Sequence, residues 1–496
     1  MANIQLIDVS IRDGNQSLWG ATGLNTPQIL TIAPVMDRVG FRALNYTSST
    51  HMGVAVRTHH EDPWERIRLT RAAMPNTPLE FIGTGLRFIS WESQTPEFMQ
   101  LVYDRLVANG ISRFIALDPM NDVDAILDSA RMMRKAGAAE IIVALTYTIS
   151  SVHDDAYYAD LTAKLAGSPD VDRFYIKDPA GLLSPGRART LIPAIRSRIG
   201  GKALELHSHC NIGLAPITYM DAAELGVEVL QVACGPLANG TSLPNAQRVV
   251  ANLRELGHTV DIDDRALAQV ADYFTRLAAA ETLPVGVPQE YDASFLRHQV
   301  AGGVITTVKR QLAELKAEHR FDEVMEEVGR VRADLGYPIM VTPFPQIVCT
   351  QAFYNVVGSE RYSNVSDQVI RYVLGSFGRP IAPVDPNVKD RILDRPRARE
   401  LAVEAPPTPV NELRKRFAPG ISDDEFLLRV TMPAEQVDAM LAAGPARRHY
   451  NPDVQPVLKL LRGLQTRPPV ADLVVDKPNF HLELHRTHTP EATHAS

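Results

Sequence analysis

The chain has 496 residues, of which 45% are hydrophobic and 22% are charged, and its formal net charge is −7. This is ordinary globular composition, and the length is sufficient for more than one domain. Acidic and basic residues are mixed, so no basic stripe indicates nucleic acid or an anionic membrane as a partner, and no apolar run approaches the roughly 18 residues of a membrane helix.

The first half of the chain alternates between short apolar stretches and stretches whose apolar residues recur at helical spacing. The apolar stretches, which we predict to be strands, cover residues 4–11, 43–47, 79–83, 113–117, 140–148, 173–176, 203–206 and 229–234. The intervening predicted helices include residues 26–40, 62–74, 96–108, 125–137 and 215–225. Eight strands in about 250 residues predict an α/β fold, the (β/α)8 or TIM barrel.

The pattern changes after about residue 263. Amphipathic helices are predicted at residues 265–277, 306–318 and 322–335, without further strand–helix alternation. Proline becomes frequent from Glu404 onward, and the last dozen residues are polar, which is typical of a frayed end. We therefore predict a barrel domain at 1–265, a mostly helical region at 266–435, and a proline-rich segment with a flexible tail at 436–496.

Polar residues follow three of the predicted strands at their carboxyl ends. Asp13 follows the first strand, Lys177 the sixth, and His207 and His209 the seventh. These strand ends meet at one mouth of a barrel, and the two histidines share a face because side chains alternate along a strand. Imidazole and carboxylate suit Zn²⁺, and also Mn²⁺ or Co²⁺, so the sequence predicts a metal site.

Several separated motifs resemble the biotin-dependent carboxyltransferases. That family includes the carboxyltransferase domain of pyruvate carboxylase, the α subunit of oxaloacetate decarboxylase and the pyruvate-binding subunit of transcarboxylase. The motifs are R-D-G-N-Q-S-L at 12–18, E-D-P-W-E-R at 61–66, Y-T-I-S-S-V-H at 147–153, K-D-P-A-G-L-L at 177–183, and V-T-P at 341–343, with Gln299 and the glycine pair at 302–303.

The resemblance implies a divalent metal held by Asp13, His207, His209 and Lys177. A protonated lysine has no lone pair, so Lys177 would bind the metal as a carbamate formed with CO2. Zinc is the metal we expect, with manganese or cobalt as alternatives.

The resemblance also implies the chemistry. Arg12 and Gln16 would contact the carbonyl or enolate oxygen of the acceptor, and Thr342 would move a proton between biotin N1 and the acceptor carbon. The helical region would thereby complete the active site of the barrel. The implied reaction moves CO2 between carboxybiotin and an acceptor such as pyruvate or oxaloacetate, through an enolate that the metal stabilises.

The chain departs from the family pattern near the acceptor. The family's arginine for the acceptor carboxylate, at the end of strand three, is expected at Gly83, and Asn45 stands in place of a glutamate at strand two. Asn15 and Phe344-Pro345 are further departures. Because an arginine–carboxylate clamp is strong and specific, its loss favours a variant 2-oxo acid or another enolisable acceptor.

The partners follow from the same resemblance. No A-M-K-M biotinylation sequence is present, so biotin is expected on a separate carrier protein, with a separate biotin carboxylase subunit. We expect a homodimer, and the three cysteines without framework spacing favour the cytoplasm.

Two other hypotheses remain open. One is a metal-dependent lyase or Claisen-type condensing enzyme of the hydroxymethylglutaryl-CoA lyase and isopropylmalate synthase superfamily, whose D-x-x-x-R-D-G-x-Q opening fits residues 8–16. The other is a catalytically degenerate assembly subunit. We also expect His51, His59 and His60 to lie in a solvent-facing loop, and His153 to pack or form hydrogen bonds.

Overall fold

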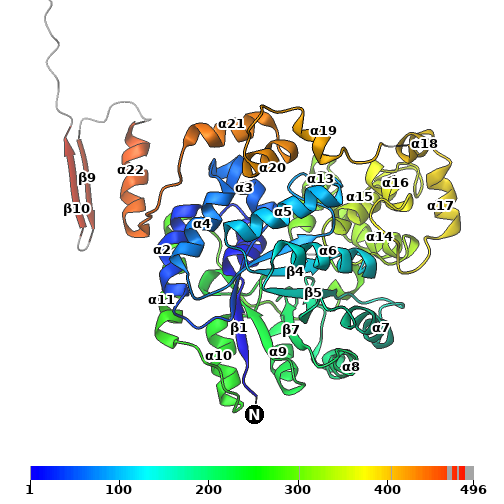
Figure 1. Cartoon of the computed structure of the whole chain (residues 1–496), viewed down its shortest axis with the longest axis horizontal. Helices are drawn as coiled ribbons and strands as arrows, with labels where there is room; N and C mark the ends of the chain where they lie inside the picture. The colour runs from blue at the N-terminus through cyan, green and yellow to red at the C-terminus, as the bar shows by residue number, and fades with distance from the viewer. Residues whose placement is uncertain (1, 301, 404, 466–471, 478–479, 486–496) are drawn as a thin grey trace, which may run out of the picture.

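The computed structural model describes residues 2–300, 302–403, 405–465, 472–477 and 480–485. Its first half is a closed barrel of eight parallel strands in sequential order, which confirms the predicted TIM barrel (Figure 1). The strands are β1 (Gln5–Asp8), β2 (Ala43–Ser48), β3 (Leu79–Thr84), β4 (Arg113–Leu117), β5 (Glu140–Thr146), β6 (Arg173–Asp178), β7 (Ala203–Ser208) and β8 (Val229–Val232).

Helices form the outer layer between and after these strands. They are α2 (Thr26–Met36), α3 (Ser49–His59), α4 (Pro63–Ala73), α5 (Pro96–Asn109), α6 (Val123–Ala136), α7 (Asp155–Ala166), α8 (Pro185–Arg196), α9 (Ala215–Glu224), α10 (Ala246–Glu255) and α11 (Asp264–Glu281). Many begin at a capping side chain, such as Thr95 of α5 and Asp122 of α6. Such a cap provides an acceptor for an N–H group that has no partner within the helix.

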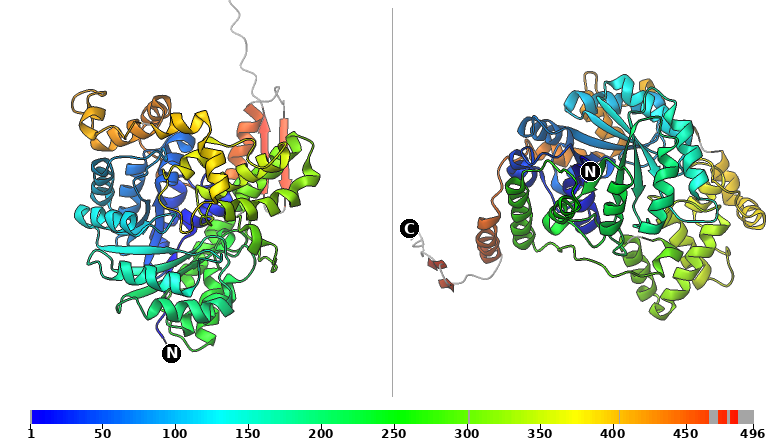
Figure 2. Two further views of the ribbon diagram at one scale, coloured as in Figure 1. Left: turned by 90° about the vertical axis from the view of Figure 1, so that its right-hand side faces the viewer. Right: turned by 90° about the horizontal axis from the view of Figure 1, so that it is seen from below.

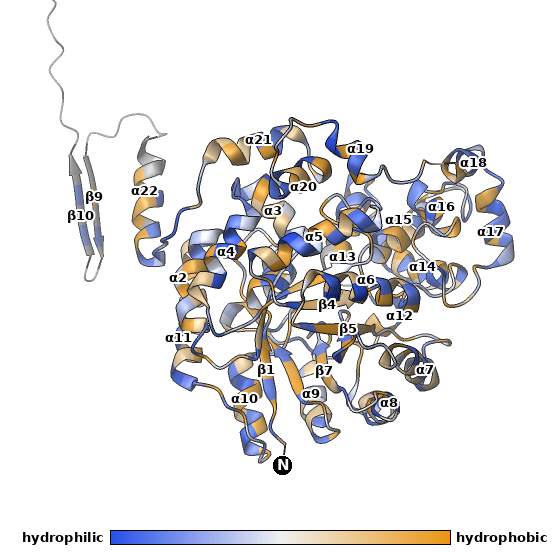
Figure 3. Ribbon diagram, in the orientation of Figure 1, coloured by the Kyte–Doolittle hydropathy of each residue, from blue (hydrophilic) through white to orange (hydrophobic). Residues whose placement is uncertain are grey.

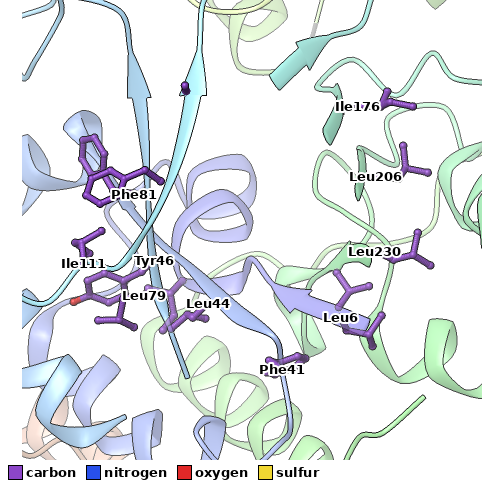
Figure 4. Close-up of a cluster of buried hydrophobic side chains, with 14 of the residues drawn as sticks. Leu6, Phe41, Leu44, Tyr46, Leu79, Phe81, Ile111, Ile176, Leu206 and Leu230 are labelled. Carbon is purple, nitrogen blue, oxygen red and sulfur yellow. The ribbon is translucent and has the colours of Figure 1, made fainter. Parts of the chain in front are cut away.

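The strands are buried on both faces, as their nearly continuous apolar sequences require. Side chains such as Leu6, Phe81 and Leu206 belong to the large cluster between strands and helices, parts of which Figure 4 shows. Alternate residues, including Ile82 and Ile115, form a smaller cluster with Tyr175. Colouring by hydropathy shows apolar strands surrounded by helices of mixed character (Figure 3).

A second hydrophobic core lies in the helical region beyond the barrel. Its helices are α12 (Phe295–His298), α13 (Gly302–Glu314), α14 (Phe321–Asp334), α15 (Phe344–Val357), α16 (Asp367–Val373), α17 (Pro386–Leu393) and α18 (Pro396–Ala402), with the short η3 (Glu318–Arg320). Figure 2 shows this region on one side of the barrel.

The chain then returns to the barrel. The helices α19 (Val410–Arg414), α20 (Asp423–Thr431) and α21 (Ala434–Ala443) follow, and α20 packs on α5 while α21 packs on α3. Phe426 and Met440 belong to the barrel's core cluster. Further on lie η4 (Pro452–Val454), α22 (Gln455–Gln465) and an antiparallel pair, β9 (Asp472–Lys477) and β10 (Phe480–His485).

The predicted domain limits at 265/266 and 435/436 stay predictions. The predicted frayed end lies outside the described residues, except for His485. Within the described part of the chain, none of the helices is both long and apolar enough to cross a membrane.

Two local elements differ from the expectation and shape the site. The first strand ends at Asp8, and Arg12 and Asp13 lie in a π-helical turn, η1 (Ser10–Gly14), followed by α1 (Asn15–Trp19). The second strand runs directly into α3, where a loop was expected.

Candidate active site

The predicted cluster forms at the mouth of the barrel. His207 Nε2 lies 3.3 Å from Asp13 Oδ2, and His209 Nε2 lies 3.5 Å from Asp13 Oδ1. The two imidazole Nε2 atoms are 3.1 Å apart. All three residues are buried, and their ligand atoms are close enough together to hold one metal ion.

The other ring nitrogen of each histidine, Nδ1, already has a hydrogen-bond partner. His209 Nδ1 lies 2.7 Å from the Thr241 carbonyl oxygen, which can only accept, so Nδ1 carries the proton. His207 Nδ1 lies 2.7 Å from Gln231 Oε1, and burial followed by the charge of Lys177 lowers the pKa of His207 to about 3. Two Nε2 lone pairs therefore face a carboxylate, an arrangement that fits a bound cation.

Lys177 completes the cluster from β6. Its Nζ lies 3.8 Å from Asp13 Oδ2 and 3.4 Å from His207 Nε2. Burial lowers the pKa of Lys177 to about 8. A Cβ at Gly181, whose φ is +70°, would lie 2.3 Å from the His209 carbonyl oxygen, so this loop can approach the histidine strand only with glycine at that position.

Arg12 links the cluster to a buried ion network. Its Nη1 lies 2.9 Å from Asp13 Oδ2, and its Nε donates to Asn45 Oδ1 at 2.5 Å. Burial would raise the pKa of Asp13, but the Arg12 charge helps to hold it well below the usual range. Asn45 in turn donates to Glu80, which pairs with Arg113.

A cavity of about 420 Å³ connects this cluster to the helical region. Arg12, Asp13, Lys177 and His209 line it together with Gln16, and Thr342 lines it from the segment before α15. Except for His207, the predicted site residues on the barrel thus share one cavity with Thr342, which is far from them in sequence.

Polar contacts position the helical region against the barrel. Gln299 accepts from the Thr148 hydroxyl at 2.7 Å and donates to the Ile149 carbonyl at 2.8 Å. Arg332 on α14 donates to the same two residues. Thr148 and Ile149 belong to the 147–153 motif, so this motif provides the contact between the two regions.

Comparisons with known proteins agree with the geometry. The chain is 36% identical over 392 residues to a pyruvate carboxylase subunit from Methanocaldococcus jannaschii, covering 79% of this chain and 68% of the relative. The chain belongs to the biotin-dependent carboxyltransferase family. The profile of the conserved carboxylase domain matches residues 295–452.

The chain is also 29% identical over 462 residues to the 2-oxoglutarate carboxylase large subunit of Hydrogenobacter thermophilus, covering 90% of this chain and 70% of the relative. The carboxyl transferase domain of Rhizobium etli pyruvate carboxylase with pyruvate superposes with a TM-score of 0.82 at 22% identity, covering 97% of this chain and 83% of that chain. That structural likeness shows the fold.

The end of β3 departs from the expectation for this carboxyltransferase. A side chain at Gly83 would meet Met133 Cε at 2.8 Å and the Tyr103 hydroxyl at 2.9 Å, so position 83 faces the outer helices. Ile82 and Thr84 line the cavity instead. A side chain at position 83 would therefore point away from the cavity, and Thr84 is the polar residue of β3 that lines it.

One of the histidines that follow β2, His51, also differs from the expectation. His51 lies in the first turn of α3 and is buried, with Nδ1 3.0 Å from Ser48 Oγ, so the prediction of a solvent-facing loop was wrong for it. Burial lowers the pKa of His51 to about 3. The pair of serines at the start of α3 was the sequence signal for this helix, because serine is a preferred helix-capping residue.

Proposed function

We propose that this carboxyltransferase subunit moves CO2 between carboxybiotin, carried by a separate protein, and an enolisable 2-oxo acid. The observation that carries the proposal is the cavity that Thr342 shares with Asp13, Lys177 and His209, three members of the buried cluster that His207 completes. The acceptor carbon and the biotin ring nitrogen must meet in one dry space for such a transfer.

In this proposal Asp13, His207, His209 and the carbamate of Lys177 hold a divalent metal, zinc first, with manganese or cobalt as alternatives. The metal, when bound, supplies a Lewis acid to the acceptor carbonyl. Burial of Lys177 favours the neutral amine, which is the form that reacts with CO2.

The chain's own residues handle the proton and the developing charge. Arg12 and Gln16 donate hydrogen bonds to the acceptor oxygen as it becomes an enolate oxygen. The N–C bond of carboxybiotin breaks and releases CO2, Thr342 gives its hydroxyl proton to biotin N1, and it takes a proton from the acceptor carbon. The enolate carbon then forms the new bond to CO2.

The acceptor we favour is a 2-oxo acid other than pyruvate or oxaloacetate. Thr84 and Ile82, rather than an arginine, line the cavity at the end of β3. The relative named 2-oxoglutarate carboxylase large subunit supports a larger 2-oxo acid as one choice.

Two of the relatives are named as subunits, which supports the prediction from sequence that this chain works together with other proteins. We propose a biotin carrier protein and a biotin carboxylase subunit as these partners, and a homodimer of this chain. Three buried, unpaired cysteines support a cytoplasmic location.

The reverse reaction provides the test. Metal-loaded protein is incubated with free biotin and either oxaloacetate or oxalosuccinate, the carboxylation product of 2-oxoglutarate, and CO2 release is measured. We expect biotin-stimulated release, faster for oxalosuccinate, that falls about 100-fold or more in Thr342→Ala. Thr350→Ala, the same change at another residue lining the cavity, should stay within a few-fold of wild type. No biotin-stimulated release from either substrate would contradict the proposal.

A further inference from the structure

The start of α3 faces the cavity without a side-chain cap. Ser48, its N-cap residue, is extended, but its side chain accepts no hydrogen bond from the first turn, and its Oγ is occupied by His51 Nδ1. Four other helices of the barrel, α5, α6, α7 and α8, each have such a cap, from Thr95, Asp122, Asp154 and Ser184. Ser48, Ser49 and Thr50 all line the cavity, so the positive end of an 11-residue helix opens onto it.

Arg12 provides a second, independent sign of a missing anion. Its side chain is 6% exposed and lines the same cavity. Two of its nitrogens bind Asn45 and Asp13, but Nη2 is buried without a hydrogen-bond partner among the described residues. A buried, charged donor without an acceptor is unfavourable, which indicates that a ligand supplies the acceptor.

The rest of the cavity offers few other anchors for a carboxylate. Among the described residues that line it, Arg12 and Lys177 are the only lysine or arginine side chains. Lys177 lies against Asp13 and His207 in the metal cluster. The short turn η1, which carries Arg12, packs on β2, whose last residue, Ser48, occupies the N-cap position of α3. Nη2 of Arg12 and the N-terminal end of α3 therefore lie on the same wall of the cavity.

We infer that the carboxylate of the 2-oxo acid acceptor binds between the N-terminal N–H groups of α3 and Nη2 of Arg12. This inference rests on the proposed function and names the part of the site that replaces a strand-three arginine. The two N–H bonds of Nη2 can serve the carboxylate and the adjacent carbonyl oxygen together. The hydroxyls of Ser49 and Thr50 add donors to a site that a helix N-terminus already favours for anions.

Two substitutions test the helix end without removing it. Ser48→Asp places a negative charge and a good N-cap at the helix start, so it should repel a ligand carboxylate while keeping or raising the thermal midpoint. Ser49→Pro removes one N–H at the first helical position, where proline is well tolerated. Ser366→Asp at the N-cap of α16 is the matched control, since it makes the same change away from the barrel mouth.

Binding to metal-loaded protein is measured by calorimetry with pyruvate, 2-oxoglutarate and methyl pyruvate, whose ester lacks the charge. We expect at least one 2-oxo acid to bind wild type at least tenfold more tightly than the ester. Ser48→Asp should weaken 2-oxo acid binding at least tenfold and Ser49→Pro severalfold, with bound metal unchanged, whereas Ser366→Asp should match wild type. Binding within twofold of wild type in both α3 variants would overturn the inference, as would no binding of either 2-oxo acid to wild type.

The outcomes separate the inference from the proposed function. Binding that depends on α3, without any biotin-stimulated carboxyl transfer, would support the carboxylate site and contradict the proposed reaction. Carboxyl transfer whose KM is unchanged by Ser48→Asp would support the reaction and overturn the carboxylate site.

Discussion

Gln231 on β8 should control the metal affinity of the site through His207. Its side chain is buried, and its Oε1 lies 2.7 Å from His207 Nδ1. In Gln231→Leu this acceptor is lost, so the His207 proton is free to move to Nε2, where it would face Asp13 at 3.3 Å and block the lone pair. Loss of such a partner typically costs 10- to 100-fold in metal affinity, which is about 1.4 to 2.8 kcal/mol.

The assay is competition for Zn²⁺ or Co²⁺ against a chromophoric chelator, with the Co²⁺ absorption spectrum as a report on ligand geometry. Gln351→Leu is the matched control, because Gln351 is also a buried glutamine but hydrogen-bonds Asn355 and Asn364 in the helical region. The control should lose stability and keep its metal affinity. Wild-type affinity and an unchanged Co²⁺ spectrum in Gln231→Leu would refute the reasoning.

Three further predictions concern stability. Arg113→Met leaves the buried Glu80 with Asn45 as its remaining side-chain partner. Breaking a buried pair costs about 3–5 kcal/mol, so the thermal midpoint should fall by about 6 to 20 °C. Adding Glu80→Gln should restore part of the lost stability, and an additive further loss would contradict this account. Burial lowers the pKa of His153 to about 3 from an ordinary 6.5, so its neutral form stabilises the fold fully above pH 6.5 and progressively less as the pH falls toward 3. By pH 5 the free energy of unfolding should have fallen by about 2 kcal/mol from this group. In His153→Gln the denaturation midpoint should therefore fall less steeply between pH 6.5 and 5 than in wild type, and an identical slope would contradict this. Zn²⁺ at 100 times its Kd should stabilise metal-free wild type by about 2.7 kcal/mol and leave Asp13→Asn unchanged, whereas equal shifts in both proteins would place the metal elsewhere.

Much of the barrel could be predicted because its signals are local. Each strand is a short apolar run and each helix an apolar stripe, and the predicted limits of the strand at 113–117 match β4. The observed strand limits differ from the predicted ones where hydrogen bonding, rather than the polarity of the residues, decides where a strand ends. The first strand ends at Asp8 because Ser10 to Gly14 form a helical turn, which the apolar pattern around Ile11 does not reveal.

The facing of side chains at the end of β3 was left open by the sequence. Successive side chains in a strand point to opposite faces, so position 83 faces Tyr103 whereas Ile82 and Thr84 line the cavity. No local pattern distinguishes the two positions in a strand that is apolar on both faces.

The sequence by itself determined the barrel and the meeting of Asp13, Lys177, His207 and His209, because the carboxyl ends of parallel strands, with the segments that follow them, meet at one mouth. The motif resemblance also assigned Thr342 to this site, whereas only the tertiary structure decided that α3 presents an uncapped end beside an unpartnered nitrogen of Arg12. The reason is physical: the first set follows from periodicity along the chain, whereas the second depends on how separate helices pack and on which hydrogen-bonding groups that packing leaves without partners.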